Sequence, residues 1–139
     1  MAILAGVDLL AKFYCNNDDV SEVGKRFRRF VQTFITHTHA DPELDANAIY
    51  QLRNSLLHSF GLYSESRNRI YRFTVTQKVD TTLLANDNHD PERWIVNLSA
   101  LQSRFEEAVE QYGVMLWAGK APSSFSEALF EKYGWINIG

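Results

Sequence analysis

An arginine, an asparagine and a histidine are set into the otherwise helical stretch YQLRNSLLHSFG near the middle of the chain. They are Arg53, Asn54 and His58, in the pattern R-N-x-x-x-H. A neutral imidazole can take up or release a proton near neutral pH. A guanidinium can hold a phosphate through two hydrogen bonds and stabilise charge that builds up on it. In the absence of an acid cluster, these groups suit metal-free RNA cleavage, in which a base deprotonates a ribose 2′-OH that attacks the adjacent phosphate.

The helical spacing of the three residues places them on two different sides of the helix. Asn54 and His58 are four residues apart, so they share one face with an offset of about 40°. Arg53 and His58 are five apart, and their Cβ directions diverge by about 140°. A second copy of the helix facing the first would bring two complete sets into one cleft, so a functional motif predicts a symmetric homodimer. The alternative is an amphipathic helix in which Arg53 and His58 have structural roles.

A basic segment, GKRFRRF (24–30), is the second candidate. Lys25, Arg26, Arg28 and Arg29 are interleaved with phenylalanines. A basic helical face of this kind can bind the phosphates of a substrate, and Lys25, Arg26 and Arg29 are the residues predicted to do so. The alternative is that the phenylalanines belong to the core and the cations form its solvated face.

A metal site is a weaker interpretation of the histidines. His37 and His39 are two residues apart and could ligate a metal with help from Asp41 or from Asp87, His89 and Asp90. The alternative is a solvated helix C-terminus, where histidine interacts favourably with the helix dipole. The sequence fixes no third ligand, so no metal and no cofactor are predicted.

Aromatic side chains after the motif also allow two interpretations. They could stack against nucleic-acid bases or form the inner face of strands that cover the helices. The residues concerned are Tyr63, Tyr71, Phe73 and Trp94.

The elements that must position these residues follow from hydrophobic periodicity. Apolar residues recur at spacings of three and four in most of the chain and alternate with polar ones in two short runs. The pattern predicts a mainly α single domain, residues 1–139, built as a bundle of four to five helices with a β-hairpin insert over about 70–98. The expected helices cover residues 2–14, 20–36 and 42–60, the segment after residue 98, and a short stretch from Ser124 to Gly134; the expected strands are IYRFTVTQ (70–77) and RWIVNL (93–98).

Composition narrows the classes of protein that remain. The net charge of −3 argues against strong nonspecific attraction to nucleic acid but permits a local basic patch. Cys15 is the only cysteine, which excludes an intramolecular disulfide and a cysteine-based zinc site and favours a reducing, cytoplasmic location. The opening MAILAGVDLL is too short and too interrupted by Asp8 for a membrane span or signal peptide. It is expected to be a buried helix that either starts without a cap or has lost a leading segment.

The stretch R-N-S-L-L-H (53–58) resembles the R-x4-H motif of the HEPN superfamily, in which a polar residue such as Asn usually follows the arginine. The continuation HSFGLY and the position of the motif late in a long helix are also similar, and the resemblance covers about residues 1–60 and 98–118. It implies a helical bundle that often dimerises and that in many members is a metal-independent ribonuclease. By the same resemblance, Arg53 would bind the scissile phosphate, His58 would be the general acid/base, and Asn54 would orient His58 or the phosphate.

The function expected from the motif and the resemblance is therefore a metal-independent endoribonuclease of HEPN type, with a possible place in a toxin–antitoxin or defence system and an antitoxin as a possible partner. The alternative is a noncatalytic HEPN-like module that binds a nucleotide or another protein. No membrane association is expected.

Overall fold

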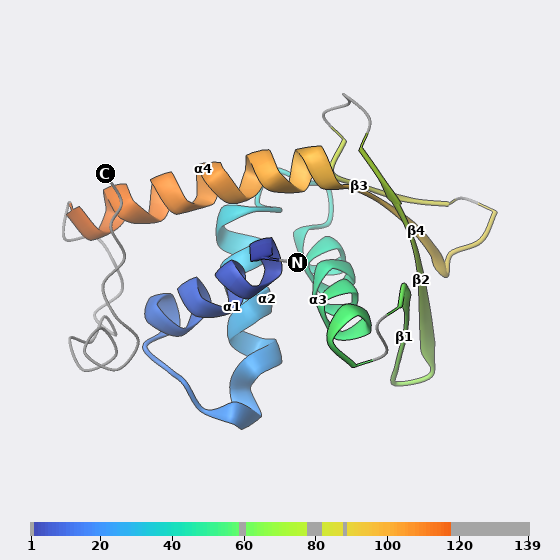
Figure 1. The fold of residues 1–139 in the computed structure, drawn as a ribbon, viewed down its shortest axis with the longest axis horizontal. Helices are drawn as coiled ribbons and strands as arrows, with labels where there is room; N and C mark the ends of the chain where they lie inside the picture. The colour runs from blue at the N-terminus through green and yellow to red at the C-terminus, as the bar shows by residue number, and fades with distance from the viewer. Residues whose placement is uncertain (1, 59–60, 78–81, 88, 118–139) are drawn as a thin grey trace.

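The computed structural model describes residues 2–58, 61–77, 82–87 and 89–117. Their chain forms a mixed α/β fold of four helices and a four-stranded sheet. Figure 1 shows the helices gathered on one side of the sheet, with α3 next to the strands and α4 running along the top of the other helices. Among the described residues, none of the helices combines the length and apolar character that a bilayer crossing requires.

The helices begin and end close to the predicted positions because local signals fix their termini. Asp41 accepts a hydrogen bond from the Leu44 amide at 3.0 Å just before Pro42, as expected for an N-cap followed by proline. Asn97 caps the last helix, since its Oδ1 accepts from the amides of Ser99 and Ala100 at 3.1 and 3.4 Å. The helices are α1 (Ala2–Cys15), a 3-10 turn η1 (Val20–Glu22), α2 (Val23–Phe34), α3 (Pro42–His58) and α4 (Leu98–Trp117).

The strands pair in the spatial order β1-β2-β4-β3. The first two form an antiparallel hairpin through a two-residue turn, in which Arg67 and Asn68 have positive φ angles of 47° and 66°. β2 and β4 pair in parallel, and β3 is antiparallel to β4. The strands are β1 (Tyr63–Ser66), β2 (Arg69–Thr76), β3 (Leu84–Asn86) and β4 (Arg93–Asn97).

The prediction of a helical bundle with a hairpin insert is therefore only partly right. The four described helices were expected, and the two predicted strands are present as β2 and β4. These strands are parallel neighbours rather than the two arms of a hairpin, and β1 and β3 complete a mixed sheet that the sequence pattern did not predict. The helix predicted from Ser124 to Gly134 lies outside the described residues.

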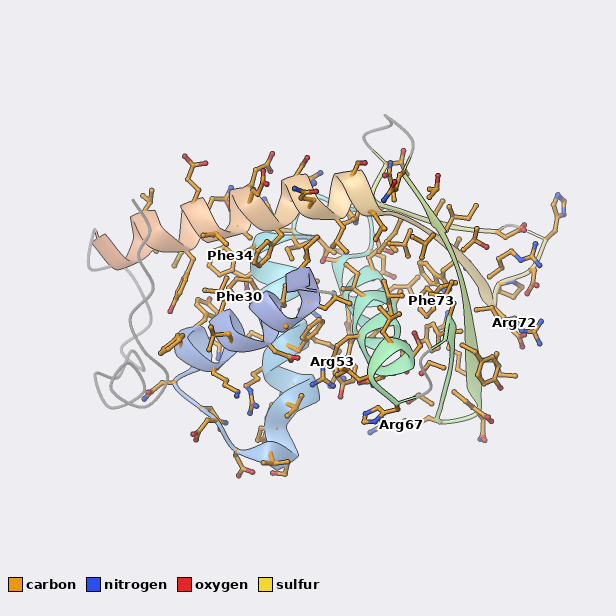
Figure 2. All side chains as sticks on the ribbon, viewed as in Figure 1. Phe30, Phe34, Arg53, Arg67, Arg72 and Phe73 are labelled. Atoms are coloured by element: carbon orange, nitrogen blue, oxygen red, sulfur yellow. The ribbon has the colours of Figure 1, made fainter. Side chains whose placement is uncertain are left out.

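The core occupies the space between the helices and one face of the sheet. Tyr14, Phe30, Phe34 and Tyr112 form an aromatic cluster with ring centroids 4.8–6.1 Å apart, and Figure 2 shows Phe30 and Phe34 among the helices. On the sheet side, alternate residues of β2 and β4 are buried, including Tyr71, Phe73, Trp94 and Val96. The intervening residues face away from the helices, so only one face of the sheet is covered by the described helices.

Candidate functional site: a polar groove between α3 and the β1–β2 hairpin

A groove of about 670 Å³ runs along α3, between α2 on one side and the β1–β2 hairpin on the other. This volume is in the range of small-molecule and cofactor sites, but the lining is predominantly polar. The residues that line it are Arg28, Glu43, Asn47, Tyr50, Gln51, Asn54, Ser55, His58, Tyr63, Ser64, Glu65, Ser66, Arg67, Arg69 and Tyr71.

The wall formed by α2 and α3 presents an arginine held by a tyrosine. The guanidinium carbon of Arg28 lies 5.1 Å from the centroid of the Tyr50 ring, within cation–π distance. Gly24, one turn before Arg28, leaves room for this contact, because a Cβ there would lie 2.9 Å from the Tyr50 ring and hydroxyl. The ring therefore supports the side chain of Arg28 where it enters the groove.

The opposite wall, formed by the hairpin, repeats this arrangement. The guanidinium carbon of Arg69 lies 5.4 Å from the centroid of the Tyr71 ring. Arg67 reaches the groove from the hairpin turn, and Figure 2 places it near the C-terminal end of α3. Each wall thus carries an arginine stacked on a tyrosine, and the turn adds a third guanidinium.

The electrostatic balance of the groove is positive, in contrast to the chain as a whole. Three arginines and two glutamates, Glu43 and Glu65, line it, which leaves a formal surplus of one positive charge with His58 neutral. Among the described residues, no carboxylate lies within ion-pair distance of Arg28, Arg67 or Arg69. Three guanidiniums without internal counter-ions therefore converge on one open groove, which favours an anionic ligand.

The base of the groove is formed by buried polar groups of α3. Gln51 is 8% exposed and Ser55 is 2% exposed. The Gln51 Oε1 accepts a hydrogen bond from Ser64 Oγ and so joins α3 to β1, while Ser55 Oγ donates to the Leu52 carbonyl at 2.7 Å. The Gln51–Ser64 bond therefore ties the hairpin to the helix, whereas the Ser55 bond stays within α3.

Two of the three motif residues lie in this groove. Asn54 and His58 both line it, and the His58 side chain is exposed at the end of α3. The prediction that these two residues share one helix face is confirmed. An accessible imidazole with a neighbouring amide can bind a phosphate oxygen or exchange a proton with a ligand in the groove.

Arg53, the third motif residue, does not line the groove. Its Nε donates to Asp8 Oδ2 of α1 at 3.0 Å, and its Nη1 donates to Asn54 Oδ1 at 3.0 Å. The Arg53 side chain is 14% exposed and that of Asp8 is 25% exposed, and Figure 2 shows Arg53 on the side of α3 that faces α1. The structure therefore links Arg53 to the groove indirectly, because the hydrogen bond from Nη1 orients the Asn54 amide.

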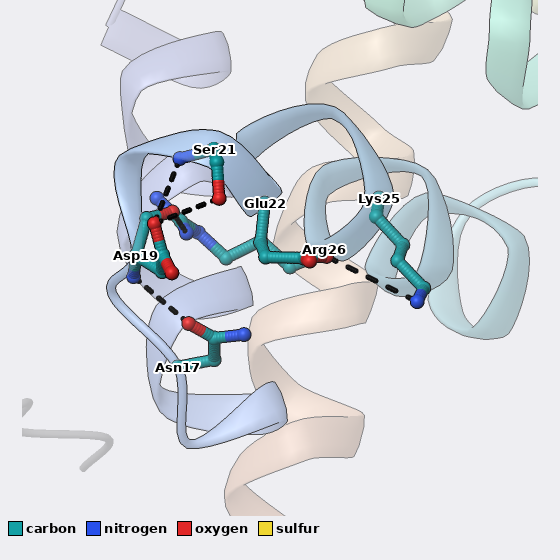
Figure 3. A network of polar contacts seen from close by, with 6 residues as sticks. All are labelled: Asn17, Asp19, Ser21, Glu22, Lys25 and Arg26. Atoms are coloured by element: carbon teal, nitrogen blue, oxygen red, sulfur yellow. Dashed lines mark hydrogen bonds and ion pairs between the residues drawn. The ribbon is translucent and has the colours of Figure 1, made fainter.

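The predicted phosphate-binding cations of α2 lie away from this groove. Lys25, Arg26 and Arg29 line a separate cavity of about 260 Å³ together with Cys15, Asn17 and Glu22. Lys25 is exposed and lies 4.0 Å from Glu22, whereas Arg26 is buried and its Nη1 donates to the Asp19 carbonyl (Figure 3). The structure thus groups these three cations but does not bring them to Asn54 and His58.

Local hydrogen bonds and stacking hold that second cluster together. Asp19 caps η1 by accepting from the Ser21 amide and hydroxyl, and the bond to Ser21 lowers the pKa of its carboxyl (Figure 3). The Arg29 guanidinium lies 5.4 Å from the Tyr14 ring centroid. Burial raises the pKa of the Cys15 thiol despite the nearby charges of Arg29 and Arg26, so the thiol stays protonated at neutral pH.

Of the histidines considered as metal ligands, His39 pairs with a carboxylate. His39 Nδ1 lies 2.7 Å from Asp45 Oδ2, in a pair that joins the loop after α2 to the first turns of α3. Within the part of the chain that the structure describes, no group of three or more possible metal ligands comes together.

Of the four aromatic residues considered for base stacking, three belong to the core and one is exposed. Tyr71, Phe73 and Trp94 are 5%, 6% and 1% exposed and belong to the core. Tyr63 is 44% exposed at the edge of the groove and is the member of this set that a base could stack on.

Several groove residues were not predicted from the sequence. Arg67 and Arg69 were missed because β1 was missed, and the turn residues Arg67 and Asn68 lack the glycine that marks a typical two-residue hairpin turn. Arg28 was noticed within the basic segment, but the side of α2 that meets α3 is decided by packing. The roles of Gln51 and Tyr50 have no local sequence signal.

Comparisons of the chain with known protein families, with characterised proteins and with solved structures give no match.

Proposed function

We propose that the groove between α3 and the hairpin binds single-stranded RNA, with Arg28, Arg67 and Arg69 contacting its phosphates. The observation that carries this proposal is the convergence of three arginines, without internal ion-pair partners among the described residues, on an open polar groove. Guanidiniums bind phosphates through paired, charge-assisted hydrogen bonds, and their geometry suits this better than that of lysine.

The other residues that line the groove favour RNA over a simple phosphate ion as its ligand. The amides of Asn47 and Asn54 can donate to and accept from base edges or a ribose 2′-OH, and Tyr63 offers an exposed ring for stacking. The groove of about 670 Å³ is open to solvent, and the net charge of −3 argues against strong nonspecific attraction of RNA to the rest of the surface.

The test is a binding titration with a fluorescent single-stranded RNA, in EDTA and at moderate salt. The Arg28→Gln/Arg69→Gln variant is expected to bind about tenfold or more weakly than wild type, because each substitution removes charge-assisted hydrogen bonds. Arg104→Gln on α4, which contributes no residue to the groove lining, is the matched control and should bind as wild type does. Equal affinity of the groove variant and wild type would contradict the proposal.

A second candidate function, RNA cleavage, is favoured by the presence of Asn54 and His58 in the same groove. His58 would take the proton of a ribose 2′-OH while that oxygen forms a bond to the adjacent phosphorus. The bond from phosphorus to the 5′-oxygen breaks to leave a 2′,3′-cyclic phosphate, and the proton that His58 took passes, directly or through water, to the leaving 5′-oxygen to give a 5′-OH. Arg28 or Arg69 would stabilise the charge on the phosphate, a role that the family resemblance assigns to Arg53.

The cleavage candidate has its own test, namely RNA cleavage in EDTA by wild type and by His58→Ala. Cleavage by wild type that is lost in His58→Ala supports the endoribonuclease. Binding without cleavage, or equal cleavage by the two proteins, leaves a noncatalytic RNA-binding module. Homodimerisation and an antitoxin partner stay predictions of the family resemblance.

A further inference from the structure

The face of the sheet that none of the described helices covers carries a row of three side chains that begins at the groove. Tyr63, Arg72 and Arg93 are direct cross-strand neighbours on β1, β2 and β4. Because adjacent strands lie about 4.8 Å apart, the row extends about 10 Å across the sheet. The residues on either side of Arg72 in β2, Tyr71 and Phe73, are buried, so Arg72 faces away from the helices, as Figure 2 shows.

The row is accessible to a ligand. Tyr63 is 44% exposed and the Arg72 side chain is 54% exposed, and Arg93 is also exposed. Two carboxylates contact this row: the Tyr63 hydroxyl donates to Glu65 Oε2 at 3.5 Å, and Glu92 Oε2 lies 4.0 Å from Arg72 Nη1 with both groups solvated. An exposed pair at this distance is worth little, so Arg72 can exchange Glu92 for a phosphate at small cost.

Tyr63 belongs both to this row and to the groove lining. A strand that leaves the groove at Tyr63 therefore meets Arg72 and then Arg93 without crossing another element of the described chain. Ile95, 40% exposed on the same face of β4, adds apolar surface beside the row. An exposed ring followed by two cations is the combination with which proteins bind single strands, through base stacking and phosphate contact.

We infer that this sheet face, which no described helix covers, is an extension of the RNA-binding groove, along which Tyr63, Arg72 and Arg93 bind nucleotides that lie beyond the groove. This inference rests on the proposed function, since the strand must first occupy the groove. It predicts that the natural ligand is an oligonucleotide rather than a mononucleotide.

The test compares oligouridylates of three and ten nucleotides, each carrying a fluorophore, with wild type, the row variant Arg72→Gln/Arg93→Gln and the groove variant Arg28→Gln/Arg69→Gln. Wild type should bind the ten-nucleotide strand at least about tenfold more tightly. The row variant should lose about tenfold in affinity for the long strand and less than about twofold for the short one. The groove variant should lose affinity for both, and Arg104→Gln should lose neither.

The outcomes separate this inference from the proposed function. If the row variant binds the long strand as wild type does while the groove variant does not, the extension is wrong and the groove stands. Equal affinity of wild type for the two lengths would likewise show that the extension is wrong while the groove proposal stands. If wild type binds neither strand, the groove proposal fails and the extension fails with it. If sedimentation shows a wild-type dimer that becomes a monomer in the row variant, the row is a contact between copies, and the inference is overturned.

Discussion

Arg53 of α3 donates from its Nε to Asp8 Oδ2 of α1 at 3.0 Å, across 45 positions of sequence. The same guanidinium donates from Nη1 to Asn54, whose side chain lines the groove. Arg53 therefore joins the N-terminal helix to the helix that carries the candidate site. Its position explains why the motif arginine is not itself exposed to a ligand in the groove.

Replacing Arg53 by alanine is expected to lower the free energy of unfolding by about 1–3 kcal/mol, because Asp8 would be left partly buried without its partner. Urea denaturation measures this difference. Arg104→Ala is the control, since the Arg104 pair with Glu107 is long, at 3.9 Å, and Glu107 is exposed. The control should change stability by no more than about 0.5 kcal/mol. Equal, small losses in the two variants would show that the Arg53–Asp8 pair is not a structural tie.

The N-terminus of α4 gives a second prediction, because Asn97 caps this helix. Asn97→Ala should cost about 1 kcal/mol of stability, since Asn97 Oδ1 accepts from two amides at the start of the helix. Ser99→Ala is the matched control and should change stability by a few tenths of a kcal/mol at most. Thermal unfolding followed by circular dichroism compares the two variants. A larger loss of stability in Ser99→Ala than in Asn97→Ala would show that Ser99 caps α4 instead.

The caps at Asp41 and Asn97 illustrate how far local sequence patterns determine this fold. Helices were predicted well because periodicity and capping residues such as Asp41 act within one or two turns. β1 was missed because YSES has no apolar alternation, and its pairing depends on Ser64 meeting Gln51 from α3. The parallel pairing of β2 with β4 was missed because it joins segments about 20 residues apart and has no turn signal of its own.

The candidate site was predictable to a similar extent. Asn54 and His58 share a helix face, which their spacing alone predicts. The partner of Arg53 could not be predicted, because Asp8 lies on a different helix and only tertiary packing brings the two together. For the same reason, the sequence could not show that Arg28 enters the groove while Arg26, two residues earlier, is buried against the Asp19 carbonyl.

Tyr112 provides a third prediction. Its hydroxyl is buried and has no hydrogen-bond partner among the described residues. Since an unpaired buried hydroxyl is unfavourable, Tyr112→Phe should leave the free energy of unfolding unchanged or raise it by about 1 kcal/mol. Chemical denaturation at neutral pH measures this. A loss of more than about 1 kcal/mol would mean that the hydroxyl contributes a stabilising bond.

The pH dependence of the same variant follows from the pKa of Tyr112, which burial raises above its ordinary value. The folded protein holds the phenol proton more tightly than the unfolded chain does. This contribution to stability is complete below about pH 10, the unfolded value, and is lost as the pH rises above it. Wild type should therefore lose stability above about pH 10 more steeply than Tyr112→Phe, as denaturation at pH 9 and pH 11 would show. Parallel losses in the two proteins would contradict this.

The proposed function requires that Arg28 and Arg69 bind phosphates of a single strand from the two walls of the groove. The measurement that tests it most directly is the salt dependence of RNA affinity for wild type and Arg28→Gln/Arg69→Gln. Each phosphate contact with a single strand contributes about −0.7 to the slope of log K against log salt concentration, so the variant should have a slope shallower by about 1.4. Identical slopes for the two proteins would contradict the claim, even if the affinities differed.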